Sequence, residues 1–184
     1  MEKNITSILF SKVRKVRAPH RGTTFSAGLD FFIPDDMVFP NGKHYCFLKG
    51  GQSIVVPSGI RMNIPKGYAL IAQDRSSVAV QGLILGAKLV DQDYQGEIHF
   101  HLINSTRKRK IRIFAGQKIT QFALVPVIFP KPLQVKDSNL FKERTTRGKG
   151  AFGSTDKHLN NDTGTRKRLD KNLPHSKVVK SFRR

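Results

Sequence analysis

Several residue types are missing or rare in this sequence, and each shortage narrows what the chain can be. Tryptophan is absent, and Cys46 is the single cysteine among 184 residues. One cysteine can form no internal disulfide and has no cysteine neighbours for a structural zinc ion, so we expect a reducing compartment. No apolar run approaches the roughly 18 residues of a transmembrane helix, and no apolar leader is present. We therefore expect a soluble, intracellular protein of the cytoplasm or of a host cell, with the nucleus as an alternative compartment.

Acidic residues are also scarce. The chain has 13 Asp and Glu against 33 Lys and Arg, which gives a formal net charge of +20. This excess attracts polyanions such as nucleotides, nucleic acids and acidic surfaces. Residues 157–184 contain nine of the basic residues, two acidic ones and few large apolar side chains. We expect this segment to be a disordered tail that contacts nucleic acid without sequence preference.

Turn signals and short apolar runs predict the fold class. Turns rich in Pro, Gly, Asn and Asp separate short apolar runs at a spacing of about 8 to 12 residues, for example QSIVV, IRMNI and YALIA. No apolar repeat of 3.6 residues extends through residues 1–156, although a brief helix fits residues 76–81. The pattern predicts an all-β sandwich or jelly roll. We place a β domain at residues 1–142, a Gly-rich arm at 143–156 and the tail at 157–184.

Residues 86–104 carry the strongest chemical signal. Two strands are predicted to meet there at a tight turn that contains Asp91, Asp93 and Tyr94. Turns often contain Asp because its side chain bonds to the local backbone, so architecture explains this turn as well as catalysis does. The outgoing strand has the alternation of a half-buried strand. Its apolar residues are Ile98, Phe100 and Leu102, and its polar residues are Glu97, His99 and His101.

Residue types that suit a phosphate-bearing ligand occur elsewhere in the chain. Arg75, Ser76 and Ser77 offer a guanidinium group and two hydroxyls to one phosphate, although Ser76 also suits a helix N-cap. Asp30 ends the segment AGLD, which fits a turn followed by a strand. Gln121 stands among apolar neighbours, where an amide needs a partner.

Two further segments are predicted to be loops, one rich in glycine and one rich in basic residues. In residues 147–155 the glycines allow backbone N–H groups to approach a phosphate, and Phe152 could cover a base. The spacing is not that of a Walker loop. The run STRKRK, residues 105–110, fits either a solvated hairpin tip or a contact with nucleic acid or phosphate.

Five of these segments, in this order, resemble the five motifs of the trimeric dUTPase family, the deoxyuridine triphosphate nucleotidohydrolases. The resemblance covers roughly residues 5–156. The segments are AGLD at 27–30, DRSSVA at 74–79, LVDQDYQGEI at 89–98, GQKITQF at 116–122 and RGKGAFGST at 147–155.

The resemblance implies a distorted β-barrel of the jelly-roll class that assembles as a homotrimer. The three active sites would lie at subunit interfaces, each closed by the swapped C-terminal arm of another subunit. The implied reaction is hydrolysis of dUTP to dUMP and pyrophosphate, which limits uracil in DNA and supplies dUMP for dTTP synthesis.

The resemblance also assigns roles to residues. Asp91 would orient the water that attacks the α-phosphate, and Tyr94 would pack against the deoxyribose. Mg²⁺ would be held by triphosphate oxygens and water rather than directly by side chains, with Asp30 in a supporting carboxylate network. The other implied contacts are Arg75, Ser76, Ser77 and Gln121 on the phosphate chain, Arg147, Gly153, Ser154 and Thr155 around the γ-phosphate, and Phe152 stacked on uracil.

The chain departs from the usual family pattern near the third motif. Lys88 stands where glycine is usual, and Leu85 stands where an asparagine helps to recognise uracil. The sequence therefore leaves base selectivity open. Asp74 replaces the usual Pro or Gly, and we expect it to neutralise part of the charge of Arg75. Lys118 stands where arginine is usual.

Three alternatives to dUTP hydrolysis deserve comparison. A dCTP deaminase of the same fold needs a glutamate on the outgoing strand, where this chain has His101. A dNTP pyrophosphatase with another base choice fits the departures at Leu85 and Lys88. A non-catalytic regulatory or nucleic-acid-binding relative fits the basic charge, but retention of Asp91 and Tyr94 favours an enzyme.

Overall fold

Short antiparallel strands make up the first of two units in the computed structural model, which describes residues 7–150. The two units are Met1–Pro130 and Lys131–Arg184. In the second unit, the described residues 131–150 contain one turn of 3-10 helix, η1 (Asp137–Asn139). Part of the predicted arm and all of the predicted tail lie outside the described residues, so the boundaries at residues 142 and 156 stay predictions.

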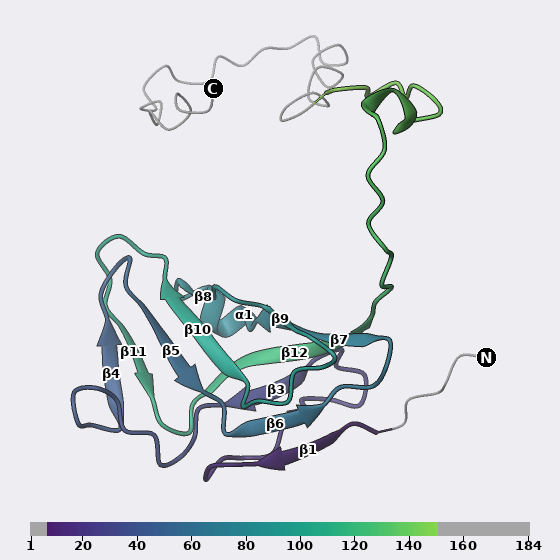
Figure 1. Cartoon of the computed structure of the whole chain (residues 1–184). Helices are drawn as coiled ribbons and strands as arrows, with labels where there is room; N and C mark the ends of the chain where they lie inside the picture. Colours follow the sequence, from purple (N-terminus) through teal and green to yellow (C-terminus); the bar gives the residue numbers. More distant parts are fainter. Residues whose placement is uncertain (1–6, 151–184) are drawn as a thin grey trace, which may run out of the picture. The chain divides into compact units, whose positions relative to one another are not determined.

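Within the described residues the first unit has twelve strands and one short helix (Figure 1). The helix, α1 (Ser76–Ala79), confirms the brief helix expected there and is shorter than predicted. The strands are β1 (Leu9–Lys12), β2 (His20–Arg21), β3 (Leu29–Phe32), β4 (Tyr45–Leu48), β5 (Ser53–Pro57), β6 (Ile60–Asn63), β7 (Tyr68–Asp74), β8 (Leu83–Leu85), β9 (Leu89–Val90), β10 (His99–Asn104), β11 (Ile111–Phe114) and β12 (Lys118–Pro126).

The strands pair into four sheets, which confirms the all-β class expected from the sequence. The orders are β2-β3-β12-β7-β9, β5-β10-β8, β11-β4 and β1-β6. Three buried rings tie the first two sheets together. Phe31 of β3 lies 4.7 Å from Phe122 of β12 and 6.3 Å from Phe100 of β10, measured between ring centroids. Large buried aromatic rings dominate core energetics, so this cluster fixes the five-stranded sheet against β10.

Two predicted hairpins were wrong. The acidic turn does not close a hairpin, because β9 pairs with β7 whereas β10 pairs with β5 and β8. Residues 105–110 likewise join β10 to β11, whose partner is β4. The alternation correctly predicts that Phe100 and Leu102 are buried. It contains no information about which strand lies alongside, and here the neighbours in sequence belong to different sheets.

No helix among the described residues is both long enough and apolar enough to cross a membrane.

Candidate active site

Three adjacent strands bring predicted site residues from separate segments to one end of the five-stranded sheet. In the register of β3 and β12, Gln121 lies opposite Asp30. In the register of β12 and β7, Asp74 lies opposite Thr120, next to Gln121, and Arg75 follows directly. Antiparallel pairing therefore gathers Asp30, Arg75 and Gln121, which are far apart in the sequence.

Asp30 is a buried carboxylate shared by two cations. Its side chain accepts a hydrogen bond from Lys118 Nζ at 2.9 Å and forms an ion pair with Arg75 Nε at 3.3 Å. Arg75 Nη1 also donates to the backbone oxygen of Lys118 at 3.3 Å. These contacts fix the orientation of a guanidinium group that is still partly exposed. Two cations against one carboxylate leave a net positive charge, which suits a phosphate ligand.

Gly28 explains how the Gln121 side chain fits beside this cluster. A Cβ atom at Gly28 would lie 2.9 Å from Gln121 Oε1 and 3.0 Å from its Cβ, closer than side chains pack. The glycine of AGLD is therefore needed for this close approach, a reason that the sequence did not provide. The Gln121 side chain makes no hydrogen bond within residues 7–150, so its amide is available to a ligand.

Ser76 and Ser77 begin α1, and both are exposed. Arg75 occupies the N-cap position in an extended conformation, with φ −76° and ψ 134°, so the alternative interpretation of Ser76 as the N-cap was wrong. Both hydroxyl groups instead lie within the first turn after Arg75. This placement is compatible with a shared phosphate contact, which stays a prediction.

Asp91 lies away from this cluster within the same chain. Val90, the residue before it, pairs with Leu70 near the beginning of β7, whereas Arg75 follows the end of β7. Arg75 is five residues beyond Leu70 along the chain, a distance of roughly 17 Å at about 3.3 Å per residue. The structure therefore brings Asp30, Arg75 and Gln121 together and leaves Asp91 and Tyr94 at the other end of β7.

Tyr94 and Asp91 line a small cavity of about 170 Å³. The Tyr94 hydroxyl donates to the backbone oxygen of Glu97 at 2.7 Å, which holds the ring across the turn. Gly96 permits this position, because a Cβ atom there would lie 2.5 Å from the Tyr94 hydroxyl oxygen. The ring remains 43% exposed, so it can be covered further by a ligand. The cavity is completed by Leu89, Val90, Ile98 and His99.

The glycine-rich arm is described only in part. Arg147 belongs to the second unit, is exposed, and donates from Nε to the backbone oxygen of Gly150 at 3.2 Å. Gly148 has a φ of +49°, a conformation that favours glycine. The remaining predicted arm residues, Phe152, Gly153, Ser154 and Thr155, lie outside the described residues, so their contacts stay predictions.

Comparison with known proteins decides the family. The family model described as dUTPase matches residues 14–156. The chain belongs to the dUTPase family. Proteins named deoxyuridine 5'-triphosphate nucleotidohydrolase include one from Hydrogenovibrio crunogenus, 32% identical over 79% of this chain and 90% of its own length. One from Yarrowia lipolytica is 35% identical over 76% and 82%, and one from Paramecium bursaria Chlorella virus 1 is 34% identical over 82% and 99%.

Solved dUTPase structures confirm the jelly-roll fold. A mutant dUTPase of Staphylococcus bacteriophage 80alpha, solved with dUpNHpp, superposes with a TM-score of 0.67 at 22% identity, over 82% of this chain and 98% of that chain. A mutant dUTPase from phage phi11 of S. aureus, for which coordination of a structural Mg(II) ion is described, gives a TM-score of 0.60 at 19% identity, over 71% and 97%. Similarity at this identity establishes the fold alone.

The departures from the usual dUTPase pattern interact with one another. Asp74 Oδ1 accepts a hydrogen bond from the backbone N–H of Leu85 at 2.8 Å, and Oδ2 pairs with Lys88 Nζ at 3.0 Å. Among the described residues, Asp74 forms no ion pair with Arg75. The carboxylate partner of Arg75 is Asp30. The expectation that Asp74 neutralises Arg75 was therefore wrong, because a closer cation across the sheet takes the carboxylate.

Glu97 makes contacts beside Tyr94 that sequence reasoning missed. Its carboxylate accepts hydrogen bonds from Arg14 at 2.8 and 3.2 Å and from the backbone N–H of Gly59 at 2.7 Å. Its backbone oxygen holds the Tyr94 hydroxyl. Burial alone raises the pKa of Glu97, but the bonds from Arg14 and Gly59 hold that pKa below the usual value of a glutamate. No local pattern signals this role, because Arg14 is 83 residues away.

Glu97 predicts a pH-dependent contribution to stability. Its folded pKa is lowered, so the stabilisation is present above the unfolded pKa of about 4.3 and is lost as pH falls through the lowered folded value. We expect Glu97→Gln to lower the free energy of unfolding by roughly 1 kcal/mol at neutral pH, after allowance for the exposed Arg14, and by almost nothing at strongly acidic pH. Urea unfolding at several pH values measures the difference.

Asp93→Asn is the matched control for this prediction. Asp93 is an exposed acidic residue four positions before Glu97, and its replacement leaves the Arg14–Glu97 pair intact. A loss in Glu97→Gln that is independent of pH, or one that Asp93→Asn reproduces, would contradict the assignment.

Proposed function

We propose that the protein hydrolyses dUTP to dUMP and pyrophosphate. The observation that carries the proposal is the match to the dUTPase family over residues 14–156, which includes Asp30, Arg75, Asp91 and Gln121. The anion-attracting cluster at the end of β7 and the separate cavity beside Asp91 supply the two chemical parts that this reaction needs.

The proposed reaction is an in-line displacement at the α-phosphorus. A water oxygen forms a bond to that phosphorus and its proton passes to solvent, while the bond between the α-phosphorus and the oxygen that bridges to the β-phosphate breaks and pyrophosphate leaves with that oxygen. Asp91 is exposed and accepts a hydrogen bond from the attacking water, which places the water in line. Arg75 and Gln121 donate to the phosphate chain, where negative charge develops on the leaving group. Tyr94 packs on the sugar and leaves no room for a 2′-hydroxyl.

Mg²⁺ fits this chain as a companion of the substrate. The described residues contain no cluster of three or more His, Cys, Asp or Glu able to hold a metal ion, and Asp30 is already paired with Arg75 and Lys118. We propose that triphosphate oxygens and water hold the ion, as Mg²⁺ often binds through substrate phosphates. The ion would supply charge neutralisation on the pyrophosphate.

We propose further that each active site is completed by other copies of the chain, in a homotrimer. Leu70, which pairs with Val90 beside Asp91, lies roughly 17 Å from Arg75 along β7, and this separation supports the use of Asp91 and Arg75 from different copies at one site. Apolar side chains of β1, including Leu9 and Phe10, are exposed beside a cavity of about 480 Å³ that also reaches Tyr94. The arm, residues 143–156 of another subunit, would then add Arg147, Phe152, Gly153, Ser154 and Thr155.

A substrate panel tests the proposed function. The purified protein is given dUTP, dCTP, dTTP or UTP with Mg²⁺, and pyrophosphate release is followed. We expect cleavage of dUTP and almost no cleavage of UTP, because Tyr94 excludes the 2′-hydroxyl. Preference for dCTP would identify a same-fold enzyme with altered base choice, consistent with Leu85 and Lys88. Absence of turnover on all four would overturn the proposal in favour of a non-catalytic relative.

A further inference from the structure

The two-stranded sheet of β4 and β11 presents an aromatic and cationic surface to solvent. Burial alternates along both strands, so that Cys46, Leu48, Ile111 and Ile113 face the core. The opposite side carries Tyr45, Phe47, Arg112 and Phe114, which we call the β4–β11 face. Phe47 and Phe114 are 53% and 43% exposed, whereas phenylalanine side chains are most often buried in folded proteins.

The side chains of the β4–β11 face form one continuous row. The register places Phe47 opposite Arg112 and Tyr45 opposite Phe114. The rings of Tyr45 and Phe47 lie 5.9 Å apart, and the Arg112 guanidinium carbon lies 4.5 Å from the Tyr45 centroid and 5.7 Å from that of Phe114. Aromatic rings and guanidinium planes are the platforms on which unpaired bases stack.

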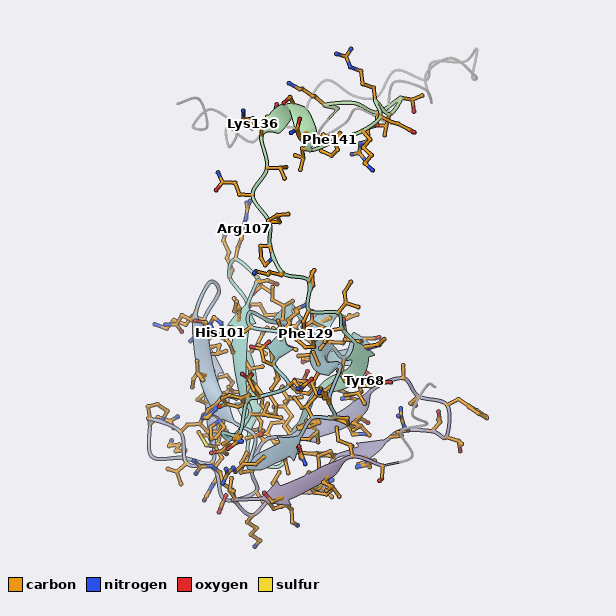
Figure 2. All side chains as sticks on the ribbon, turned by 45° about the vertical axis from the view of Figure 1, so that its right-hand side comes forward. Tyr68, His101, Arg107, Phe129, Lys136 and Phe141 are labelled. Carbon is orange, nitrogen blue, oxygen red and sulfur yellow. The ribbon has the colours of Figure 1, made fainter. Side chains whose placement is uncertain are left out.

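A basic loop lies at one end of this face. Residues 107–110, Arg-Lys-Arg-Lys, join β10 to β11, and Figure 1 shows this connection at the same end of the sheet as the connection from β4 to β5. Arg107 extends from the end of β10, remote from Tyr68 at the start of β7 (Figure 2). The backbone at Gly50 packs directly against the carbonyls of Thr106 and Arg107, so the two connections are in contact.

Asn104 holds the basic loop in a defined conformation. This fully buried amide donates to the backbone oxygens of Leu48 and Arg109, both at 2.8 Å. Its Oδ1 accepts from the N–H of Thr106 at 3.0 Å and from the Thr106 hydroxyl at 2.8 Å. A satisfied buried network of this kind rigidifies the segment it anchors. The backbone that carries the four basic residues is thereby held next to the end of β4.

The segments that form this surface carry charge of one sign, although the Asp35 carboxylate from another segment approaches Gly116, two residues after Phe114. Residues 37–73 and 98–136, which include β4, β5, β10 and β11, contain no Asp or Glu at all. The loop and the face are therefore flanked by Lys43 and Lys49 with no acidic residue from those segments to offset them. A surface with positive charge beside exposed rings is complementary to a strand of phosphates with unpaired bases.

We propose that the β4–β11 face and the basic loop together bind single-stranded nucleic acid. The loop contacts phosphates, and the bases stack on Phe47, Phe114 and Arg112. Double-stranded nucleic acid offers phosphates to the loop but no unpaired bases to the face. This surface is formed by a different sheet from the one that holds Asp30 and Arg75.

Binding of labelled oligonucleotides to the full-length protein tests the proposal. Fluorescence anisotropy is measured with an oligothymidine of about 16 nucleotides, with a duplex of the same length, and with oligouridine, whose relative affinity identifies DNA or RNA as the occupant. We expect tighter binding of single strands than of the duplex. Phe47→Leu with Phe114→Leu, which keeps apolar volume and removes the rings, should weaken single-strand binding roughly tenfold or more and leave duplex binding unchanged.

Matched controls separate this surface from general electrostatics. Phe25→Leu removes another ring that is 96% exposed. In a plot of log affinity against log salt concentration, changing Arg107, Lys108, Arg109 and Lys110 to Gln should make the slope less negative by up to about 3. The same change at Arg166, Lys167, Arg168 and Lys171 removes four charges from the tail and should weaken binding less. Retained dUTP hydrolysis and thermal stability show that each variant is folded.

The outcome that overturns the proposal is specific. If the double leucine variant binds oligothymidine as the wild type does, or if the tail variant loses as much affinity as the loop variant, the β4–β11 face is not the binding surface. If the double leucine variant changes the mass in sedimentation instead, the face is an interface between copies of the chain, and the proposal is equally wrong.

Discussion

Asp91→Asn is expected to lower kcat for dUTP by roughly 10²- to 10⁴-fold, the range for loss of a group that positions and accepts from a reacting water. Asparagine keeps the shape of the side chain and its place after β9, so the fold should be retained. KM should change little, because the proposed partner of Asp91 is the water rather than the nucleotide. Pyrophosphate release at saturating dUTP measures the effect.

The control for this prediction lies two residues away. Asp93 is exposed in the same turn, and we assign it no role in the reaction. Asp93→Asn should therefore retain the wild-type rate. A similar loss in both variants would point to charge or turn conformation rather than to water activation, and a retained rate in Asp91→Asn would remove Asp91 from the mechanism.

The second large effect is recovery of activity in mixed oligomers. Asp91→Asn and Arg75→Ala, each nearly inactive alone, are co-expressed with different affinity tags and purified through both tags. If one site uses Asp91 from one copy and Arg75 from another, every mixed trimer contains one intact site in three, and about a third of the wild-type rate returns. The separation of the two residues along β7 is the structural reason for this expectation.

A chain with both substitutions provides the comparison. Mixed with wild-type chains and purified in the same way, trimers with two wild-type chains keep one intact site, so this mixture shows that co-purified oligomers are active. If both residues acted within one copy, the mixture of single variants would stay inactive while this mixture would not. That pattern would exclude sites shared between copies.

Local patterns in the sequence predicted a large part of this fold. Alternation predicts the buried face of β10 because a period of two is a property of each strand alone. The five motif segments predicted the family because they keep their order and residue types, and the family comparison confirmed it. Only the family resemblance implied that Asp30, Arg75 and Gln121 lie close together. The register of β3, β12 and β7 explains how they come together.

The remaining features depend on contacts between distant residues. The partner of Glu97 is Arg14, and neither residue carries a local signal of the other. The pairing of β9 and β10 with different sheets follows from packing of the whole core, since each strand would satisfy its alternation equally well in a hairpin. For the same reason the sequence paired Asp74 with its neighbour Arg75, whereas the fold brings Lys88 closer.

The contacts of Asp74 change how differences between dUTPases should be counted. Position by position, Asp74, Leu85 and Lys88 are three separate departures from the family pattern. In the structure one carboxylate joins all three, through the N–H of Leu85 and the ammonium group of Lys88. Replacement of Lys88 alone by glycine would leave the Asp74 carboxylate with one hydrogen-bond partner, the N–H of Leu85. Asp74 and Lys88 are therefore expected to change together across evolutionary lineages, whereas the residue at position 85 contributes only its backbone N–H and is free to vary by itself.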